Sequence, residues 1–114
     1  MGYKKGMFCV AAVLMGVSIL SASIQLTTQE NQQRNPAISG KWVVYEDNRS
    51  GNWDIWVMNL ETRETWPICT ESHNQRFPAI SGNLVAWEDW RNDDQSQDIY
   101  GYDLGTQQEF VVCM

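Results

Sequence analysis

The chain has 114 residues, a length that allows one small domain. Its formal net charge is −6, and the charge becomes −8 once Lys4 and Lys5 are removed with a leader. This acidic balance argues against nucleic acid or an anionic membrane surface as a partner, because both attract clustered Lys and Arg. It is typical of a soluble surface, and it also suits a cationic partner or a divalent metal.

Residues 1–23 have the three parts of an export signal. Lys4 and Lys5 form a basic start, the run Met7–Leu20 is apolar, and small residues follow at 21–23. The run has 14 residues, short of the roughly 17–25 of a membrane-spanning helix. We therefore expect a cleaved signal helix, with an uncleaved N-terminal anchor as the alternative and the only membrane contact. Either predicts an exported protein, periplasmic or at the cell surface or extracellular.

A repeat organises the rest of the chain. Residues 35–47 (NPAISGKWVVYED) return as residues 77–89 (FPAISGNLVAWED), with eight of thirteen positions identical at an offset of 42. Self-similarity at one period indicates that one structural unit is used twice. The similarity extends upstream, because residues 24–34 align with 66–76. We therefore expect an orphan outer strand and connection at 24–34, a first unit at 35–71 and a second at 77–114.

Each unit contains four short segments rich in β-branched and aromatic residues, separated by turn residues. The expected strands are 36–39, 42–46, 55–60 and 65–69, then 78–81, 84–88, 99–104 and 109–113. The second strand of each unit is a continuous apolar run, which indicates burial on both faces. Gly101 lies inside a strand and predicts the close approach of a neighbour. Four antiparallel strands per roughly 40–45 residues predict an all-β fold of propeller blades.

The repeated residues point to a known family. The pattern P-A-I-S-G-x-x-V-x-[YW]-E-D-x-R, followed by D-I-[WY] and a [DN]-L-x-T turn, resembles the TolB-like β-propeller repeat of exported and cell-surface proteins. The resemblance implies antiparallel four-stranded blades and covers residues 24–114. It also implies a departure, since closed propellers hold about four to eight blades. With two blades and an extra strand, we expect the partners to be other proteins or further blades, including a homo-oligomer.

Charged residues recur once per unit. The series Glu46-Asp47-x-Arg49 recurs as Glu88-Asp89-x-Arg91. One interpretation is that the carboxylates line a channel or the top surface, with Arg49 and Arg91 as ligand-binding groups. The other interpretation pairs each arginine with a carboxylate of its own loop, as expected for residues that every repeat requires.

Acidic residues crowd the loop of the second unit. Asp89, Asp93, Asp94 and Asp98 form a weak candidate calcium site, although their spacing lacks fixed calcium-loop positions. A solvated acidic loop is the alternative interpretation. His73 is the only histidine, so we expect neither a histidine metal site nor a catalytic dyad.

Three of the six tryptophans lie outside the expected core. Trp53 and Trp90 fall in loops and Trp66 on an outer strand, so these three could form a platform for sugars or peptide side chains. Packing between blades is the alternative role. Cys69 and Cys113 occupy equivalent places in the two units, too far apart for a bridge, which favours free or intermolecular thiols.

Our leading hypothesis is a non-enzymatic, exported propeller fragment that acts in protein–protein interaction at the cell envelope or surface. No catalytic constellation and no cofactor are expected. Two alternatives remain, the first from the residues and the second implied by the resemblance. One is a carbohydrate-binding surface module that uses the tryptophans, and the other is part of a propeller that gates a peptidase.

Overall fold

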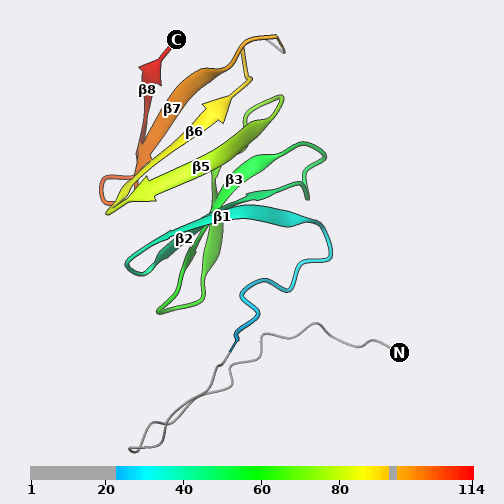
Figure 1. Ribbon diagram of the computed structural model, residues 1–114, viewed down its shortest axis with the longest axis vertical. Coiled ribbons are helices and arrows are strands. Elements are labelled where there is room, and N and C mark those ends of the chain that lie inside the picture. Colours follow the sequence, from blue (N-terminus) through cyan, green and yellow to red (C-terminus); the bar gives the residue numbers. More distant parts are fainter. Residues whose placement is uncertain (1–22, 93–94) are drawn as a thin grey trace, which may run out of the picture. The chain divides into compact units, whose positions relative to one another are not determined.

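The computed structural model describes residues 23–92 and 95–114. The expected signal helix lies outside the described residues. Residues 31–114 form one compact unit, which contains the eight strands found among the described residues (Figure 1). The strands are β1 Gln33–Ser39, β2 Trp42–Asp47, β3 Asp54–Asn59, β4 Thr65–Cys69, β5 Gln75–Ser81, β6 Leu84–Asp89, β7 Asp98–Asp103 and β8 Gln108–Cys113.

The strands form two antiparallel sheets in sequence order, β1-β2-β3-β4 (blade 1) and β5-β6-β7-β8 (blade 2). This confirms the all-β, four-stranded blades predicted from the repeat. Within the described ranges, no helix has the length and hydrophobicity needed to cross a membrane.

Strands β1 and β5 begin three residues earlier than the prolines at which we expected them to start. In each, a bulge places two residues opposite one residue of the next strand, Tyr45 in blade 1 and Trp87 in blade 2. Asn35 and Phe77 take left-handed φ angles of 51° and 56° at this bulge. Pairing can therefore continue past the proline, which has no N–H to donate.

The N-terminal segment differs from its prediction. Ile24 makes an isolated bridge, and residues 25–29 have no regular secondary structure. A strand exists only while its backbone is paired, and the eight strands of the two sheets pair among themselves. The orphan strand expected at 24–28 is thus not formed in this single chain.

The core lies between the two blades. It is built from β-branched and aromatic side chains of both sheets: Val44, Ile55, Val57, Ile68, Cys69, Val85, Trp87, Tyr100 and Leu104. Strand β2 is buried on both faces, as predicted, but β6 alternates between buried and more exposed positions. The two copies of one sequence therefore occupy different environments.

Gly101 has the close neighbour that the sequence predicted. A Cβ atom at this position would lie 2.5 Å from the Phe110 ring, which comes from the paired position on β8. In blade 1 the corresponding pair is Val57 and Trp66, and there Val57 is fully buried. The missing side chain of Gly101 is replaced by a ring laid across the strand.

The hairpin turn of blade 1 supplies a test of the fold. Gly40 opens the two-residue loop between β1 and β2 with φ of +55°, the left-handed geometry typical of this tight turn. We expect Gly40→Ala to lower the free energy of unfolding by about 1–2 kcal/mol, because a Cβ is unfavourable there. Urea unfolding measures this, and Gly40→Asn should cost less, since Asn tolerates the conformation. Equal losses for both variants would contradict the assignment.

Candidate interaction surface

The contact between the blades centres on the carboxylate of Glu46, which is completely buried. Its Oε1 accepts a hydrogen bond from Arg34 Nε at 2.8 Å, and its Oε2 accepts one from Asn35 Nδ2 at 2.7 Å. From blade 2, the backbone N–H of Phe77 donates to Oε2 at 2.7 Å, and Arg76 Nε lies 3.6 Å from Oε1. The Glu46 carboxylate therefore links β1 of blade 1 to β5 of blade 2.

The bulges place these donors. The left-handed residue of each bulge, Asn35 or Phe77, follows an arginine that pairs in register with the glutamate of its own sheet. Burial raises the pKa of Glu46, but the hydrogen bonds from Asn35, Phe77 and Arg34 more than offset it, and the pKa lies below its usual value. Glu46 is thus held ionised inside the protein.

Further contacts join the two blades. The Gly82 N–H donates to Ser39 Oγ at 2.9 Å, and Trp42 Nε1 donates to Asn83 Oδ1 at 3.0 Å. Trp42 and Trp66 meet edge to face at 5.9 Å on the side of blade 1 that blade 2 covers. These contacts show which positions of a blade are covered when another blade follows it.

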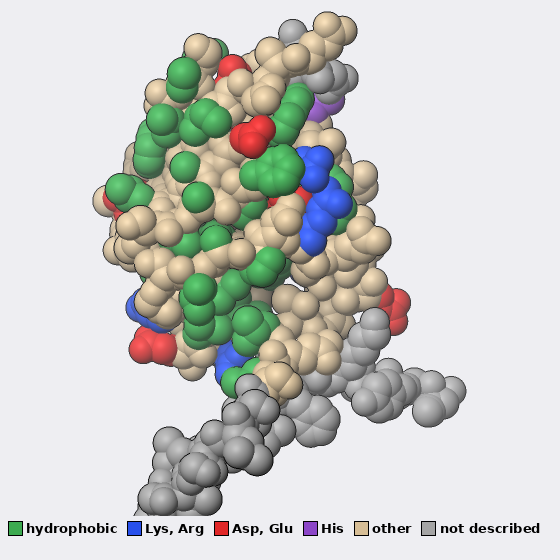
Figure 2. Space-filling view, viewed as in Figure 1, with side chains coloured by type: hydrophobic (Ala, Val, Ile, Leu, Met, Phe, Trp, Pro, Cys, Tyr) green, Lys and Arg blue, Asp and Glu red, His purple; other side chains and the backbone are tan. Residues whose placement is uncertain are grey.

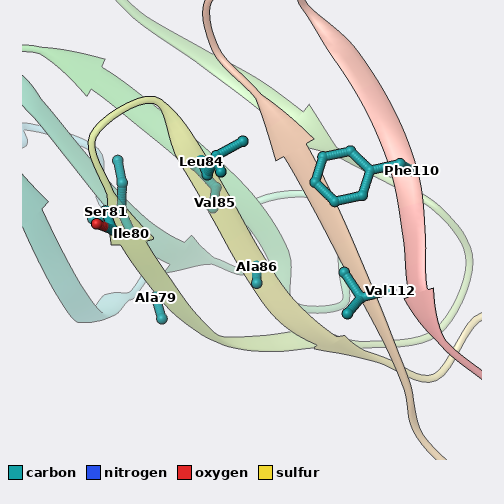
Figure 3. A pocket seen from close by; sticks show the side chains of 8 residues that line it. All are labelled: Ala79, Ile80, Ser81, Leu84, Val85, Ala86, Phe110 and Val112. Atoms are coloured by element: carbon teal, nitrogen blue, oxygen red, sulfur yellow. The ribbon is translucent and has the colours of Figure 1, made fainter.

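The corresponding side of blade 2, here called the open face, has no such cover from the described residues. A hollow of about 340 Å³ lies on it, lined by Ala79, Ile80, Ser81, Leu84, Val85, Ala86, Phe110 and Val112 (Figure 3). Figure 2 shows hydrophobic side chains reaching the surface over this part of the molecule. Single exposed apolar residues are normal on a protein, but a contiguous group indicates an interaction site.

Comparing equivalent positions shows what is missing. Leu84 and Phe110 are 53% and 41% exposed, and their counterparts Trp42 and Trp66 are half-buried and packed against the core. Val112 is 56% exposed, whereas its counterpart Ile68 is only 8% exposed. Every one of these positions is more buried in blade 1, where a second blade lies over it.

Glu88 is the blade 2 counterpart of Glu46. It pairs in register with Arg76 and is half-buried, but the structure records no hydrogen bond to its carboxylate from any described residue. The sequence placed Glu88 in the repeated carboxylate series and predicted uncovered apolar sheet faces, but it did not assign Glu88 to such a face. The signal was present in the repeat, because Leu84, Phe110 and Val112 align with Trp42, Trp66 and Ile68, which are more buried in blade 1.

Arg49 and Arg91 are paired inside their own loops. Arg49 donates to both carboxylate oxygens of Asp47, at 2.9 and 2.7 Å, and lies over the Trp56 ring. Arg91 Nη2 donates to Asp89 Oδ2 at 2.7 Å, and the guanidinium also contacts Glu109, Cys69 and Tyr100. The structure therefore shows the ion-paired loop that was one of the two interpretations.

The three candidate tryptophans are each half-buried. Trp66 packs against the inter-blade core, and the guanidinium of Arg34 lies 3.5 Å from the centre of the Trp53 ring. The backbone N–H of Trp90 donates to Asn74. Among the described residues the structure records no ring contact between any two of the three, so it does not assemble them into a platform.

The candidate calcium loop is only partly described, because Asp93 and Asp94 lie outside the described residues. Asp89 Oδ2 accepts hydrogen bonds from Arg91 and from Trp87 Nε1, and Asp98 accepts one from Asn92. No group of three or more metal-binding side chains occurs within residues 23–92 and 95–114. The calcium site stays a prediction.

The two cysteines of the repeat are free thiols in different surroundings. Cys69 is buried between the blades beside Arg91, and burial raises the pKa of its thiol to about 12. Cys113 is exposed at the end of β8. Of the two, Cys113 is therefore the one accessible to another molecule.

Comparison with known proteins bears on the fold. No protein-family model matches the chain, and no curated protein matches it. Among solved structures, TolB from Acinetobacter baumannii aligns with a TM-score of 0.66 and 21% identity, over 82% of this chain and 24% of that one. A putative TolB from Agrobacterium tumefaciens aligns with a TM-score of 0.64 and 19% identity, over 80% of this chain and 36% of that one.

The chain thus spans about a quarter and about a third of these two proteins. Likeness at such low identity shows the fold alone. It confirms the TolB-like propeller blades that the repeated residues predicted.

Removing the inter-blade carboxylate is the direct test of its role. We expect Glu46→Ala to lower the free energy of unfolding by about 3–5 kcal/mol, because it leaves buried donors and a guanidinium without their acceptor. Glu88→Ala is the matched control, at the same repeat position without a covering blade. Measured at low protein concentration, it should change stability by less than about 0.5 kcal/mol. Similar losses from both variants would contradict the role given to Glu46.

The paired carboxylates also predict the response to acid. Hydrogen bonds and the charge of Arg49 and Arg91 outweigh burial, so the pKa values of Asp47 and Asp89 lie below their usual range. The folded state therefore binds fewer protons than the unfolded state. This contribution to stability is present above the unfolded pKa of about 4 and is lost as pH falls through the folded values. Urea unfolding across acidic pH should show a steady loss of stability.

Asp54 provides a control of opposite sign. Its pKa is raised by burial, which its hydrogen bond from Ser50 only partly offsets. We expect Asp47→Asn to make the loss of stability in acid shallower and Asp54→Asn to make it steeper. Parallel pH profiles for both variants and the unchanged protein would contradict the assigned pairing.

Proposed function

We propose that this chain is a non-enzymatic, exported protein-interaction module that binds protein partners through the open face of blade 2. The observation that carries the proposal is the exposed apolar group on a sheet face whose counterpart in blade 1 is covered. An apolar surface of this kind is stabilised by burial against another protein. The TolB-like fold, which the two solved structures share, supports the proposal at the level of architecture.

The ionisable groups support a structural role over a catalytic one. Glu46, Asp47 and Asp89 are each neutralised by arginine and hydrogen-bonded within the protein. Their pKa values are lowered, so they remain ionised near neutral pH and do not serve as proton donors there. The proposed export rests on the leader seen in the sequence, and the mass of the isolated protein tests it by showing whether processing occurs near residue 23.

Site-specific photo-crosslinking in the producing cells tests the proposed surface. A photoreactive amino acid at Leu84, on the open face, should give a covalent adduct with a polypeptide that mass spectrometry identifies. The matched control is Glu61, whose exposed side chain lies in the loop between β3 and β4, and it should give none. No adduct at Leu84, or equal adducts at both positions, would contradict the proposal.

A further inference from the structure

We infer that the partner of the open face is a second copy of this chain, which docks its β1 strand there in a head-to-tail arrangement. The inference rests on the proposed function, because it names the partner of the same surface. It follows from comparing the contact that already exists inside the chain, where β5 lies against blade 1, with the contact that a second copy would make.

The strand that a second copy offers is nearly the same as the strand already used. β5 is the strand of blade 2 that contacts β1, β2 and β3 of blade 1. Its sequence is QRFPAIS, and that of β1 is QRNPAIS, so six of seven positions are identical. The open face of blade 2 is the counterpart of the blade 1 surface that holds β5. The β1 strand of a further copy could therefore bind there as β5 binds blade 1.

The side chains of β1 are exposed where those of β5 are covered. Pro78 is buried and Ile80 packs against the inter-blade core. Their counterparts in β1 are exposed, with Ile38 at 65%. A contact like that between blades 1 and 2 needs a free first strand and a free sheet face. Among the described residues, β1 is exposed at one end of the blade pair, and the open face is exposed at the other.

The receiving carboxylate is also present. Glu46 accepts the N–H of Phe77 and lies beside Arg76. By the same relation, Glu88 would accept the N–H of Asn35 and lie beside Arg34 of the second copy. Asn35 already has the left-handed φ of 51° that matches the 56° of Phe77, so its backbone needs no rearrangement to present the donor.

A second hydrogen bond is reproduced, and one is lost. Ser81 Oγ would accept the N–H of Gly40 from the second copy, as Ser39 Oγ accepts that of Gly82. The bond from Trp42 Nε1 to Asn83 has no equivalent, because Leu84 and Lys41 occupy those places. The contact between copies is therefore weaker than the contact within the chain.

The contact that a second copy could make with blade 1 is limited in area, because much of blade 1 is already buried. Val43, Tyr45 and Met58 are already buried in the single chain. We therefore assign the contact to β1 and the bulge residues, and not to the whole sheet. Because the two surfaces differ, the interface is heterologous, and it closes into a ring if the rotation permits. Closed propellers of about four to eight blades would need about two to four copies.

Solution mass, measured by light scattering over a range of concentrations, is the first test. The unchanged protein should form a concentration-dependent assembly. Glu88→Ala should weaken association at least about tenfold, as expected when a charge-paired interface group is removed. Glu88→Gln should weaken it less, because the amide oxygen still accepts the Asn35 N–H. A protein that stays monomeric throughout, or a Glu88→Ala variant that assembles like the parent, would overturn the inference.

A mixing experiment tests the head-to-tail geometry. Ile38→Asp blocks β1 and Leu84→Asp blocks the open face, so each variant alone should be monomeric. Mixed together, they retain one intact half each and should form a 1:1 dimer that grows no further. Val111→Asp is the control, since Val111 alternates to the other face of β8 and is exposed. An Ile38→Asp variant that assembles normally, or mixed variants that stay apart, would overturn the inference.

The failure of this inference can be told apart from that of the proposed function. If Leu84 crosslinks to a different protein while the purified chain stays monomeric, the second copy is wrong and the interaction role stands. If Leu84 gives no protein adduct, both fail. Near-ultraviolet circular dichroism of each variant shows whether the core tryptophans keep their packing, which separates lost assembly from lost folding.

Discussion

The buried carboxylate of Glu46 is the constraint on which the arrangement of the two blades depends. An ionised group without access to water is costly unless hydrogen bonds and opposite charge replace its hydration. Blade 1 supplies part of that replacement through Arg34 and Asn35, and blade 2 supplies the remainder through Phe77 and Arg76. The glutamate therefore favours a state in which one blade lies against another. The bulge at Phe77 and Pro78 orients the Phe77 N–H toward the Glu46 carboxylate, and this hydrogen bond replaces part of its hydration.

The asymmetry between the blades follows from that dependence. The same repeated sequence is buried on both faces in β2 but only on alternate positions in β6. The two strands differ at three of six positions, but the residues at all three are apolar or aromatic in both. The difference in burial arises because blade 1 has a following blade against it and blade 2 does not. Leu84, Phe110 and Val112 of blade 2 thus occupy core positions of the repeat without their neighbour.

The charged residues of the loops stabilise the hairpins through ion pairs within each loop. Arg49 and Arg91 each pair with an aspartate two residues earlier and lie over an aromatic ring of the next strand. Such a pair fixes the start of the loop and covers the ring with a flat cation. The aspartate and arginine of the repeated charged series, which the sequence allowed as a ligand-binding group, therefore pair within their own loop. On the open face, by contrast, the exposed side chains Leu84, Phe110 and Val112 are apolar.

The residues alone predict the strand content, the four-stranded unit and the family resemblance, because turns, β-branched runs and an identical repeat are local features of the sequence. They also predict the close approach at Gly101. They do not identify Glu46 as the link between blades, since its donors Arg76 and Phe77 lie some thirty residues away. Nor do they separate the covered face of blade 1 from the open face of blade 2, since both carry apolar residues at equivalent positions. Only packing decides that, because burial depends on which neighbour is present and not on the residue itself.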